Sequence, residues 1–386
     1  MIPIVKPYIP PKEVLMPALE ETIYSGYIAQ GQKVEDFEFK LGQYFENKNV
    51  LTVNSGTSAL HLSLILANVG PGDEVISTAL TAEPTNTAIA QTGAKVIWAD
   101  TEVLTGLICP KSVEKLITNK TKAIMIVHYA GMVTNLNEFY SIREKYNIPV
   151  IEDCAHAFGA EYKGQKLGYY SDFAIYSFQA IKHLTTIDGG LLVLKSPSDY
   201  DRAKKLRWFG LDKTTPRLQN NITEGGFKYH MNDVNATFGL VQLNYLEENV
   251  NKYIENGLFF DKELKDVDGI EIIKYHDNTK PSYWLYTAII DRRDDFIEYM
   301  KSNGVECSPL HLRNDRHSIF EDGSYLSGLE SFYSRFIHWG CGWWLSQEDR
   351  IKIVDLIKKL PKMIPGKVNG KPVRVPFSIP IEYKLG

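Results

Sequence analysis

The residue best suited to chemistry is Lys182, which lies between two apolar runs in the segment SFQAIKHLTTIDGG (Ser177–Gly190). Burial disfavours the charged form of a lysine, so it lowers the pKa of the side chain and frees a nucleophilic amine. An exposed lysine in a turn is the plainer interpretation. The apolar neighbours and the glycines that follow favour a buried, reactive amine.

Two carboxylates and a histidine, Glu152, Asp153 and His156, follow another apolar run at 148–151. They therefore lie at the end of an expected strand. A buried carboxylate needs a partner for its charge, and a heterocyclic nitrogen that must stay protonated would be such a partner. A core acid that is satisfied by its neighbours, next to a surface histidine, is the alternative.

A third segment, NSGTSAL at 54–60, follows a strand-like run and opens a helix-like one. Small residues there let the backbone approach an anion, and the free N–H groups at the start of a helix suit a phosphate. Ordinary helix capping by Ser55 or Thr57 is the alternative. The sequence has neither a GxxxxGKS/T nor a GxGxxG motif, which counts against a P-loop protein and a dinucleotide enzyme.

The elements that would position these segments alternate along residues 50–195. Most apolar runs there are continuous, as in strands that are buried on both faces. Helix-like stretches at 57–68 and 135–146 lie between them. The pattern predicts an α/β fold with a mainly parallel sheet, whose ligands bind beyond the carboxyl ends of the strands. The expected strands are 49–53, 74–78, 94–99, 123–128, 149–152, 173–178 and 190–194.

A smaller region follows a long helix expected at 234–256. Strands at 270–273 and 283–290 and helices at 295–303 and 347–360 predict an α+β domain. We therefore divide the chain into a large domain (1–250), a smaller C-terminal domain (251–360) and a C-terminal extension (361–386). The extension is either an extended tail or a segment that wraps onto a partner subunit.

The composition is that of an average soluble globular protein, since 44% of the 386 residues are apolar and 23% are charged. A formal net charge of −4 gives no basic surface for nucleic acid. No apolar run reaches the roughly 18 residues that span a bilayer, and the N-terminus lacks the apolar stretch of a signal peptide. We expect a cytoplasmic protein with free cysteines, without a metal site and without nucleic-acid or membrane partners.

Together the three segments resemble the DegT/DnrJ/EryC1/StrS family of sugar aminotransferases, which depend on pyridoxal 5'-phosphate (PLP). Further matches are SGY at 25–27, VHYAG at 127–131 and YHMND at 229–233, so the resemblance runs in order from about residue 4 to residue 360. It implies PLP fold type I, the aspartate-aminotransferase-like fold, with a large sheet of the seven-stranded type and a smaller α+β domain. It also implies a homodimer with shared active sites.

The resemblance assigns roles to the residues already singled out. Lys182 would form the Schiff base with PLP and move the proton of the substrate carbon. Asp153 would pair with the ring nitrogen and keep it protonated. His156 would lie near the ring hydroxyl. The phosphate ligands would be Gly56, Thr57 and Ser177.

Three further positions bear on the resemblance. Ala82 stands where an aromatic residue usually covers the PLP ring. Lys228 stands where many relatives have an asparagine that reaches the PLP phosphate of the other subunit; it is either a substitute for that contact or a surface lysine. His183 adjoins the Schiff-base lysine but does not replace it, as histidine does in the relatives that are sugar dehydratases.

The substrate residues are less sharply defined. The segment PLHLRNDRH at 309–317 is rich in hydrogen-bond donors. His311 or Arg313 from this segment could bind a carboxylate or a diphosphate, and His183 is a third candidate. A solvated loop is the alternative for the segment.

We expect a transaminase that moves an amino group from L-glutamate, which leaves as 2-oxoglutarate, to a keto sugar. The expected acceptor is nucleotide-linked, in amino-sugar or surface-glycan (lipopolysaccharide or O-antigen) biosynthesis. The alternatives are a PLP-dependent sugar dehydratase, an aminotransferase for a keto sugar acid without a nucleotide, and a PLP-binding regulator without activity. The presence of Lys182, Asp153 and Ser177 favours transamination.

Overall fold

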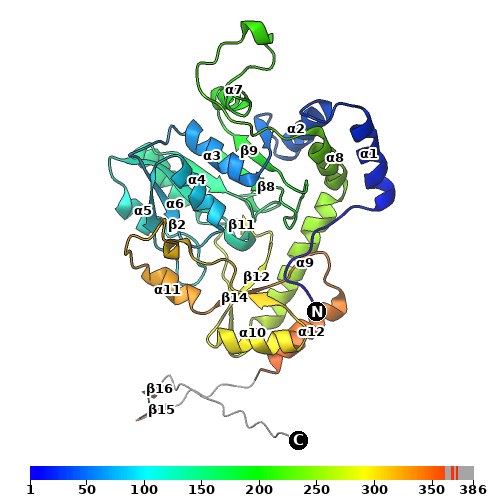
Figure 1. Ribbon diagram of the computed structural model, residues 1–386. Coiled ribbons are helices and arrows are strands. Elements are labelled where there is room, and N and C mark those ends of the chain that lie inside the picture. The colour runs from blue at the N-terminus through cyan, green and yellow to red at the C-terminus, as the bar shows by residue number, and fades with distance from the viewer. Residues whose placement is uncertain (361–366, 369–370, 373–386) are drawn as a thin grey trace, which may run out of the picture.

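Seven strands form the central sheet, in the order β1-β9-β8-β5-β4-β2-β3 (Figure 1). β9 runs antiparallel to both of its neighbours, and the other neighbouring pairs are parallel. The predicted mainly parallel sheet is thus confirmed. The computed structural model describes residues 1–360, 367–368 and 371–372. The strands of this sheet are β1 (Val50–Val53), β2 (Glu74–Thr78), β3 (Lys95–Ala99), β4 (Thr121–Val127), β5 (Val150–Asp153), β8 (Phe173–Ser177) and β9 (Gly190–Leu194).

Successive residues of each strand point to opposite faces of the sheet, and helices cover both faces. Met125 and Ile151 pack with α3, α4 and α7 on one face, whereas Ile124 and Val150 pack with α2, α5 and α6 on the other. Because both faces are buried, the strands are continuous apolar runs in the sequence. These helices are α2 (Gln32–Tyr44), α3 (Gly56–Leu66), α4 (Glu83–Gln91), α5 (Pro110–Leu116), α6 (Leu136–Tyr146) and α7 (Pro197–Leu206).

The long helix predicted at 234–256 is two helices, so this prediction was wrong. A 3-10 turn, η3 (Leu243–Tyr245), separates α8 (Asp233–Gln242) from α9 (Leu246–Leu264). Neither proline nor glycine stands at the break, so the sequence pattern gives no sign of it. α8 packs against α2 and against the N-terminal helix α1 (Lys12–Tyr24), while α9 leads to the smaller domain.

The smaller domain is built on an antiparallel sheet in the order β10-β12-β14-β13. Tyr286 and Trp339 of this sheet belong to the same apolar core as Ile124 and Val150 of the large sheet. The two sheets therefore share one core, and the boundary at residue 250 stays a prediction. The elements are β10 (Ile270–Ile272), β12 (Tyr286–Ile290), α10 (Arg293–Ser302), β13 (Cys307–Ser308), α11 (Ser327–Tyr333), β14 (Phe336–Trp339) and α12 (Gln347–Lys358).

Short elements complete the fold. β6 (Glu161–Tyr162), β7 (Gln165–Lys166) and β11 (Thr279–Lys280) form a three-stranded sheet, and β15 (Lys367–Val368) pairs with β16 (Lys371–Pro372). The rest of the predicted extension 361–386 lies outside the described residues. Isolated 3-10 turns are η1 (Tyr129–Gly131), η2 (Arg217–Gln219) and η4 (Asn314–Arg316). In the part of the chain that the structure describes, none of the helices is long and apolar enough to cross a membrane.

Residues 2–6, which we name the N-terminal strap, lie along the smaller domain (Figure 1). The N–H of Ile2 donates to the carbonyl of Gly304 (2.7 Å), and the N–H of Glu306 donates to the carbonyl of Ile2 (3.0 Å). The indole N–H of Trp344 donates to the carbonyl of Pro3 (3.1 Å). Backbone and side-chain hydrogen bonds thus join the N-terminus to the smaller domain.

Candidate active site

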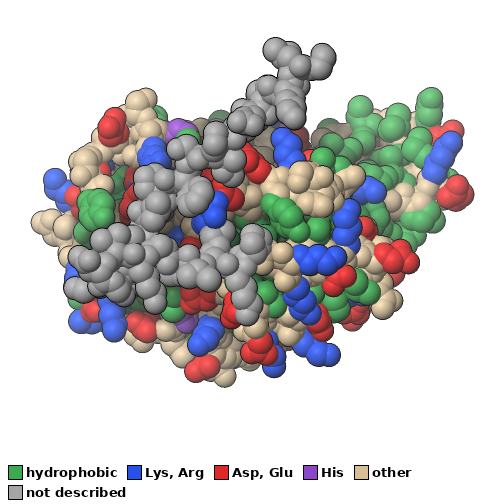
Figure 2. Space-filling model, turned by 90° about the horizontal axis from the view of Figure 1, so that it is seen from below, with side chains coloured by type: hydrophobic (Ala, Val, Ile, Leu, Met, Phe, Trp, Pro, Cys, Tyr) green, Lys and Arg blue, Asp and Glu red, His purple; other side chains and the backbone are tan. Residues whose placement is uncertain are grey.

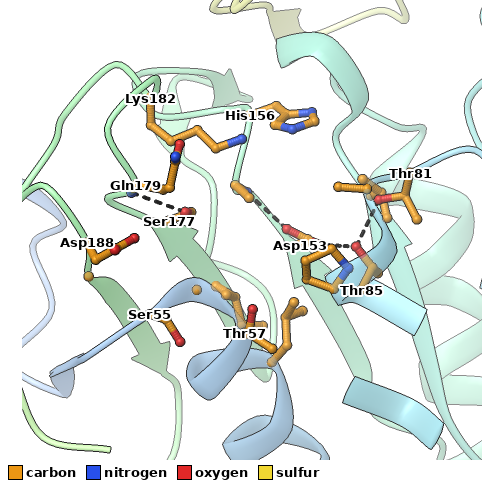
Figure 3. Close-up of a pocket in the computed structure, with 18 residues that line it drawn as sticks. Ser55, Thr57, Thr81, Thr85, Asp153, His156, Ser177, Gln179, Lys182 and Asp188 are labelled. Atoms are coloured by element: carbon orange, nitrogen blue, oxygen red, sulfur yellow. Dashed lines mark hydrogen bonds between the residues drawn. The ribbon is translucent and has the colours of Figure 1, made fainter. Parts of the chain in front are cut away.

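A pocket lies at the carboxyl ends of β4, β5 and β8, the place where parallel sheets bind their ligands (Figure 3). The start of α3, the start of α4 and the loop between β8 and β9 complete its walls. The pocket brings together the residues that the sequence predicted for cofactor binding within one chain, which are Gly56, Thr57, Asp153, His156, Ser177 and Lys182.

The start of α3 forms an anion site at one end of the pocket. The Ser55 hydroxyl caps the helix by accepting a hydrogen bond from the N–H of Ser58 (3.0 Å), so the capping alternative also holds. The N–H groups of the first helical residues, Gly56 and Thr57, have no partner within the helix. A Cβ atom on Gly56 would lie 2.9 Å from the Cβ of Ser177, so only glycine lets the helix start approach the end of β8. A phosphate would find N–H groups and the Ser177 hydroxyl together here.

Asp153 is a buried carboxylate, 3% exposed, at the end of β5. One oxygen accepts from the Thr85 hydroxyl (2.7 Å), and the other accepts from the N–H of Ala155 (3.0 Å). Burial raises the pKa of Asp153, whereas these two hydrogen bonds and the Lys182 charge act in the opposite direction. The described neighbours thus orient the carboxylate with neutral donors and leave its charge without a cation in contact. A protonated ring nitrogen fits this environment.

Lys182 lies in the loop between β8 and β9, with its amine directed into the pocket (Figure 3). Burial lowers the pKa of the amine from 10.5 to about 7, and the Asp153 carboxylate opposes this shift. A large fraction of the amine is therefore neutral near pH 7 and able to act as a nucleophile or a base. The nitrogen lies 4.1 Å from the centre of the Trp284 ring.

His156 is buried rather than on the surface, with 3% of its area exposed. Its ring stacks on Trp284, with 3.9 Å between ring centres, and its Nδ1 accepts from the N–H of Ala130 (3.4 Å). Burial holds the pKa of His156 well below its usual value, and the Lys182 charge adds to the effect. The imidazole is therefore neutral, and the bond at Nδ1 leaves its proton on Nε2. Such a ring can donate a hydrogen bond to a ring hydroxyl.

None of the three residues proposed for the substrate, His183, His311 and Arg313, lines the pocket itself. His183 is buried against Tyr253, and its Nε2 lies 3.1 Å from the carbonyl oxygen of Ser282. The guanidinium of Arg313 is paired with Asp315 and Glu330, so its charge is already neutralised. The guanidinium of Arg313 and one nitrogen of His183 thus have protein partners, whereas Nδ1 of His183 has none among the described residues. The substrate role of both side chains stays a prediction.

His311, the third substrate candidate, lies beside His156, which lines the pocket. Its ring lies nearly parallel to His156, with 5.7 Å between ring centres, and its Nε2 has no hydrogen-bond partner among the described residues. Burial lowers the pKa of His311 to about 4, so the ring is neutral at physiological pH. A neutral imidazole suits a hydroxyl or carbonyl group better than it suits a carboxylate or a diphosphate.

Ala82 and Lys228 lie where the sequence departs from the family pattern. Ala82 is the N-cap of α4 and lines the pocket, whose only aromatic side chain among the described residues is the imidazole of His156. Lys228 is exposed, and its backbone carbonyl accepts a hydrogen bond from the side-chain amide of Asn54 (3.2 Å). Asn54 is the first residue of the segment 54–60, which precedes and begins α3. Its contact with a second subunit stays a prediction.

Sequence reasoning missed Thr85 and Trp284. Thr85 lies three residues after Ala82, and its hydroxyl on the first turn of a helix was the available signal. Trp284 lies just before β12 of the smaller domain, and nothing local in the sequence connects it with Lys182.

His128, Glu152 and Cys154 form a buried polar group beneath the pocket, with ligand-type atoms within 4.8 Å of one another. Their side chains already have partners. Tyr140 donates to Glu152 (2.5 Å), while His128 accepts from the N–H of Thr134 (3.3 Å) and lies 3.4 Å from Glu152. These hydrogen bonds explain how the polar side chains of Glu152 and His128 are accommodated in the core.

Comparison with known proteins places this pocket in a known context. The model of the DegT/DnrJ/EryC1/StrS aminotransferase family matches residues 11–358. The structure of AtS13 from Actinomadura melliaura is similar with a TM-score of 0.90 and 37% identity, covering 93% of this chain and 98% of that chain. The sugar aminotransferase CalS13 from Micromonospora echinospora gives a TM-score of 0.90 and 33% identity, with coverage of 93% and 100%. Spr1654 from Streptococcus pneumoniae has been solved in a PLP form and a PMP form, and both structures give a TM-score of 0.85 and 26% identity. Both matches cover 92% of this chain, and they cover 97% of the PLP-form chain and 96% of the PMP-form chain.

Proposed function

The chain belongs to the DegT/DnrJ/EryC1/StrS aminotransferase family and is a PLP-dependent sugar aminotransferase, and on this premise we propose that it transfers the amino group of L-glutamate to a nucleotide-linked keto sugar. The main support is Lys182, whose amine has a pKa of about 7 and lies in one pocket with Asp153 and the start of α3. The product would enter amino-sugar or surface-glycan biosynthesis.

Three groups of the chain would hold the cofactor. The N–H groups of Gly56 and Thr57 and the hydroxyl of Ser177 would bind the phosphate. Asp153 would accept a hydrogen bond from the protonated ring nitrogen of PLP, and His156 would donate one to the ring hydroxyl. When bound, PLP supplies an electron sink that stabilises negative charge on the substrate carbon next to nitrogen.

Lys182 would act as base and acid in both half-reactions. Its neutral amine would take a proton from the carbon of the amino donor that bears the nitrogen. The resulting ammonium would then return a proton to the C4′ carbon of the cofactor. A pKa near 7 gives comparable amounts of the two protonation states at neutral pH, which favours transfer in both directions. His311, neutral and at the edge of the site, would hydrogen-bond the acceptor sugar.

A homodimer with shared sites belongs to the proposal. Apolar side chains of α1 and the residues that follow it are exposed in the single chain, namely Val14, Met16, Ile23, Tyr24, Tyr27 and Ile28. Figure 2 shows hydrophobic side chains gathered at the right-hand end of the molecule, the side on which α1 lies in Figure 1. A second subunit on this surface would bring its Lys228 to the PLP phosphate.

The cysteines at 109, 154, 307 and 341 are free, which agrees with the cytoplasmic location that we propose.

The absorption spectrum of the protein with PLP, before and after L-glutamate is added, tests the first half-reaction. We expect the visible absorption of lysine-bound PLP, and its conversion to that of pyridoxamine phosphate. Lys182→Ala should lose the first band and all amino transfer, whereas the control Lys204→Ala, at an exposed lysine, should keep both. Nucleotide-linked keto sugars and keto sugar acids are then compared as acceptors.

Each outcome separates the alternatives. If glutamate converts the cofactor but only the keto sugar acid is aminated, the acceptor is a keto sugar acid and not a nucleotide-linked keto sugar. Release of ammonia without an aminated product would indicate a dehydratase. A protein without lysine-bound PLP would contradict the role of Lys182 and favour a regulator.

A further inference from the structure

We propose that Trp284 is a positioning residue for Lys182, and that the face of its indole ring holds the lysine ammonium beside the reacting atoms while the amine is free. The proposal rests on the proposed function, in which Lys182 carries protons during both half-reactions. It extends the site to the smaller domain, since Trp284 lies just before β12.

The contacts of Trp284 fix the position of its ring. Its side chain is buried, with 1% exposed, and its ring centre lies 4.1 Å from the Lys182 nitrogen. Its Nε1–H donates to the carbonyl of Ile181 (2.9 Å), the residue before the lysine. The ring also stacks on His156. The indole therefore contacts both the amine and the backbone that carries it, so ring and lysine form one unit.

The backbone around Trp284 adopts an uncommon conformation that places this ring. Tyr283 has φ of 50° and Ala130 has φ of 55°, a region that non-glycine residues rarely adopt. Gly131 allows the two segments to meet, because a Cβ there would lie 2.8 Å from the N–H nitrogens of Tyr283 and Trp284. Hydrogen bonds join the segments, including the N–H of Ser282 to the carbonyl of Gly131 (3.0 Å). Such strain persists only where the surrounding structure enforces it, and it gathers at functional sites.

The ring and the charges around it determine the protonation of Lys182. A cation over an aromatic face is stabilised, and more strongly so where water is excluded. Asp153 also favours the ammonium, while burial disfavours it. His156, His183 and His311 are close enough for the Lys182 charge to affect their pKa values, but burial lowers the pKa of each and leaves the rings neutral. Trp284 and Asp153 are thus the described groups that hold the ammonium in the pocket between proton transfers.

The experiment compares Trp284→Phe with Trp284→Leu. Both variants lose the Nε1–H bond and both are smaller than tryptophan, but only phenylalanine keeps an aromatic face. The pKa of Lys182 is measured in the full chain without PLP, from the pH dependence of its reaction with fluorodinitrobenzene, read as the mass of the peptide that contains it. We expect the pKa in Trp284→Leu to fall by about one unit below that in Trp284→Phe. With PLP restored, kcat should fall at least about tenfold more in the leucine variant than in the phenylalanine variant, with similar KM for the amino donor.

Trp343→Leu is the control, because the lysine over the Trp343 ring is Lys6 of the N-terminal strap (5.1 Å) and not Lys182. It should leave the titration of Lys182 unchanged. If Trp284→Leu does not fold, Trp284→Met provides a flexible apolar side chain without a quadrupole. Equal Lys182 pKa values in the aromatic and non-aromatic variants would overturn the proposal. Failure of the proposed function is distinct, since the wild-type protein would then show no amino transfer at all.

Discussion

Asp153 and Lys182 line the same pocket, and burial shifts their pKa values in opposite directions. Burial favours the neutral acid at Asp153 and the neutral amine at Lys182, and each charge partly offsets the effect on the other. Two neutral donors, Thr85 and Ala155, hold the carboxylate in its orientation. The chain thus keeps an acid ready for a cationic ring nitrogen and an amine ready to take a proton.

Thr85→Val keeps the shape of the side chain and removes one donor to Asp153. A hydrogen bond to a charged group contributes about 1.5–3 kcal/mol, so we expect PLP affinity and turnover to fall roughly ten- to hundredfold. Equilibrium dialysis of PLP and steady-state kinetics measure both. Thr87→Val on the same helix is the control, since Thr87 bonds only backbone carbonyls of its own helix. Equal effects of the two substitutions would show that Thr85 acts through the helix and not through Asp153.

The titration of Lys182 also affects stability. Its folded-state pKa of about 7 lies below the 10.5 of a free lysine, so the unfolded chain binds more protons between these values and stability rises with pH. Lys182→Met removes this titration. Without PLP, the variant should be more stable than the wild type, with the largest difference below about pH 7 and a decreasing difference toward pH 10. Urea unfolding at pH 6 and pH 9 measures it, and a difference independent of pH would contradict the buried amine.

At the scale of elements, the pocket depends on how closely α3 approaches the ends of β8 and β9. A Cβ on Gly56 would meet Ser177, and a Cβ on Gly190 would lie 2.5 Å from the carbonyl oxygen of Ser55. Two glycines on different elements therefore bring the helix start onto the sheet. The anion site results from this approach as much as from the helix itself.

Gly56→Ala tests the approach. Alanine favours a helix by at most about 1 kcal/mol over glycine, whereas overpacking costs about 1–3 kcal/mol, so destabilisation should prevail. We expect a lower melting temperature and weaker PLP retention. Gly70→Ala is the control, because a Cβ there meets no atom within 4 Å. Unchanged PLP retention in Gly56→Ala would show that the helix start does not hold the phosphate.

The sequence predicts elements well where one physical rule dominates. Continuous apolar runs located the strands of the large sheet, because both faces of that sheet are buried. The break at Leu243–Tyr245 was not predictable, since the apolar pattern continues across it. β14 was missed because its four residues lie among aromatic residues without a clear period.

The residues of the candidate site likewise fall into those that the sequence predicts and those that it does not. Gly56 begins α3, Asp153 ends β5 and Lys182 lies in the loop that follows β8. A parallel sheet gathers such positions at one edge, so the sequence predicted them together. Trp284 contacts Lys182 from the smaller domain, and only the packing of the two sheets against each other brings it there. The pairing of Arg313 with Glu330, 17 residues away, likewise depends on a fold that local sequence does not encode.

At the scale of the whole molecule, the exposed surface of α1 predicts self-association. Ile23→Asp should shift the protein from dimer toward monomer in size-exclusion chromatography with light scattering, and weaken PLP binding through loss of the partner's Lys228. The control is Ile351→Asp on α12, which is 44% exposed, compared with 49% for Ile23. A monomeric wild-type protein, or equal behaviour of the two variants, would contradict the shared site.

The N-terminal strap has a consequence for biosynthesis. Residues 2–6 find their hydrogen-bond partners at Gly304, Glu306 and Trp344, which the ribosome adds only after the whole large domain. During translation the strap therefore has no docking place, although it is made first. A nascent chain stalled before Gly304 would leave these residues accessible to a chaperone or a protease, and their protection would report that the smaller domain has closed.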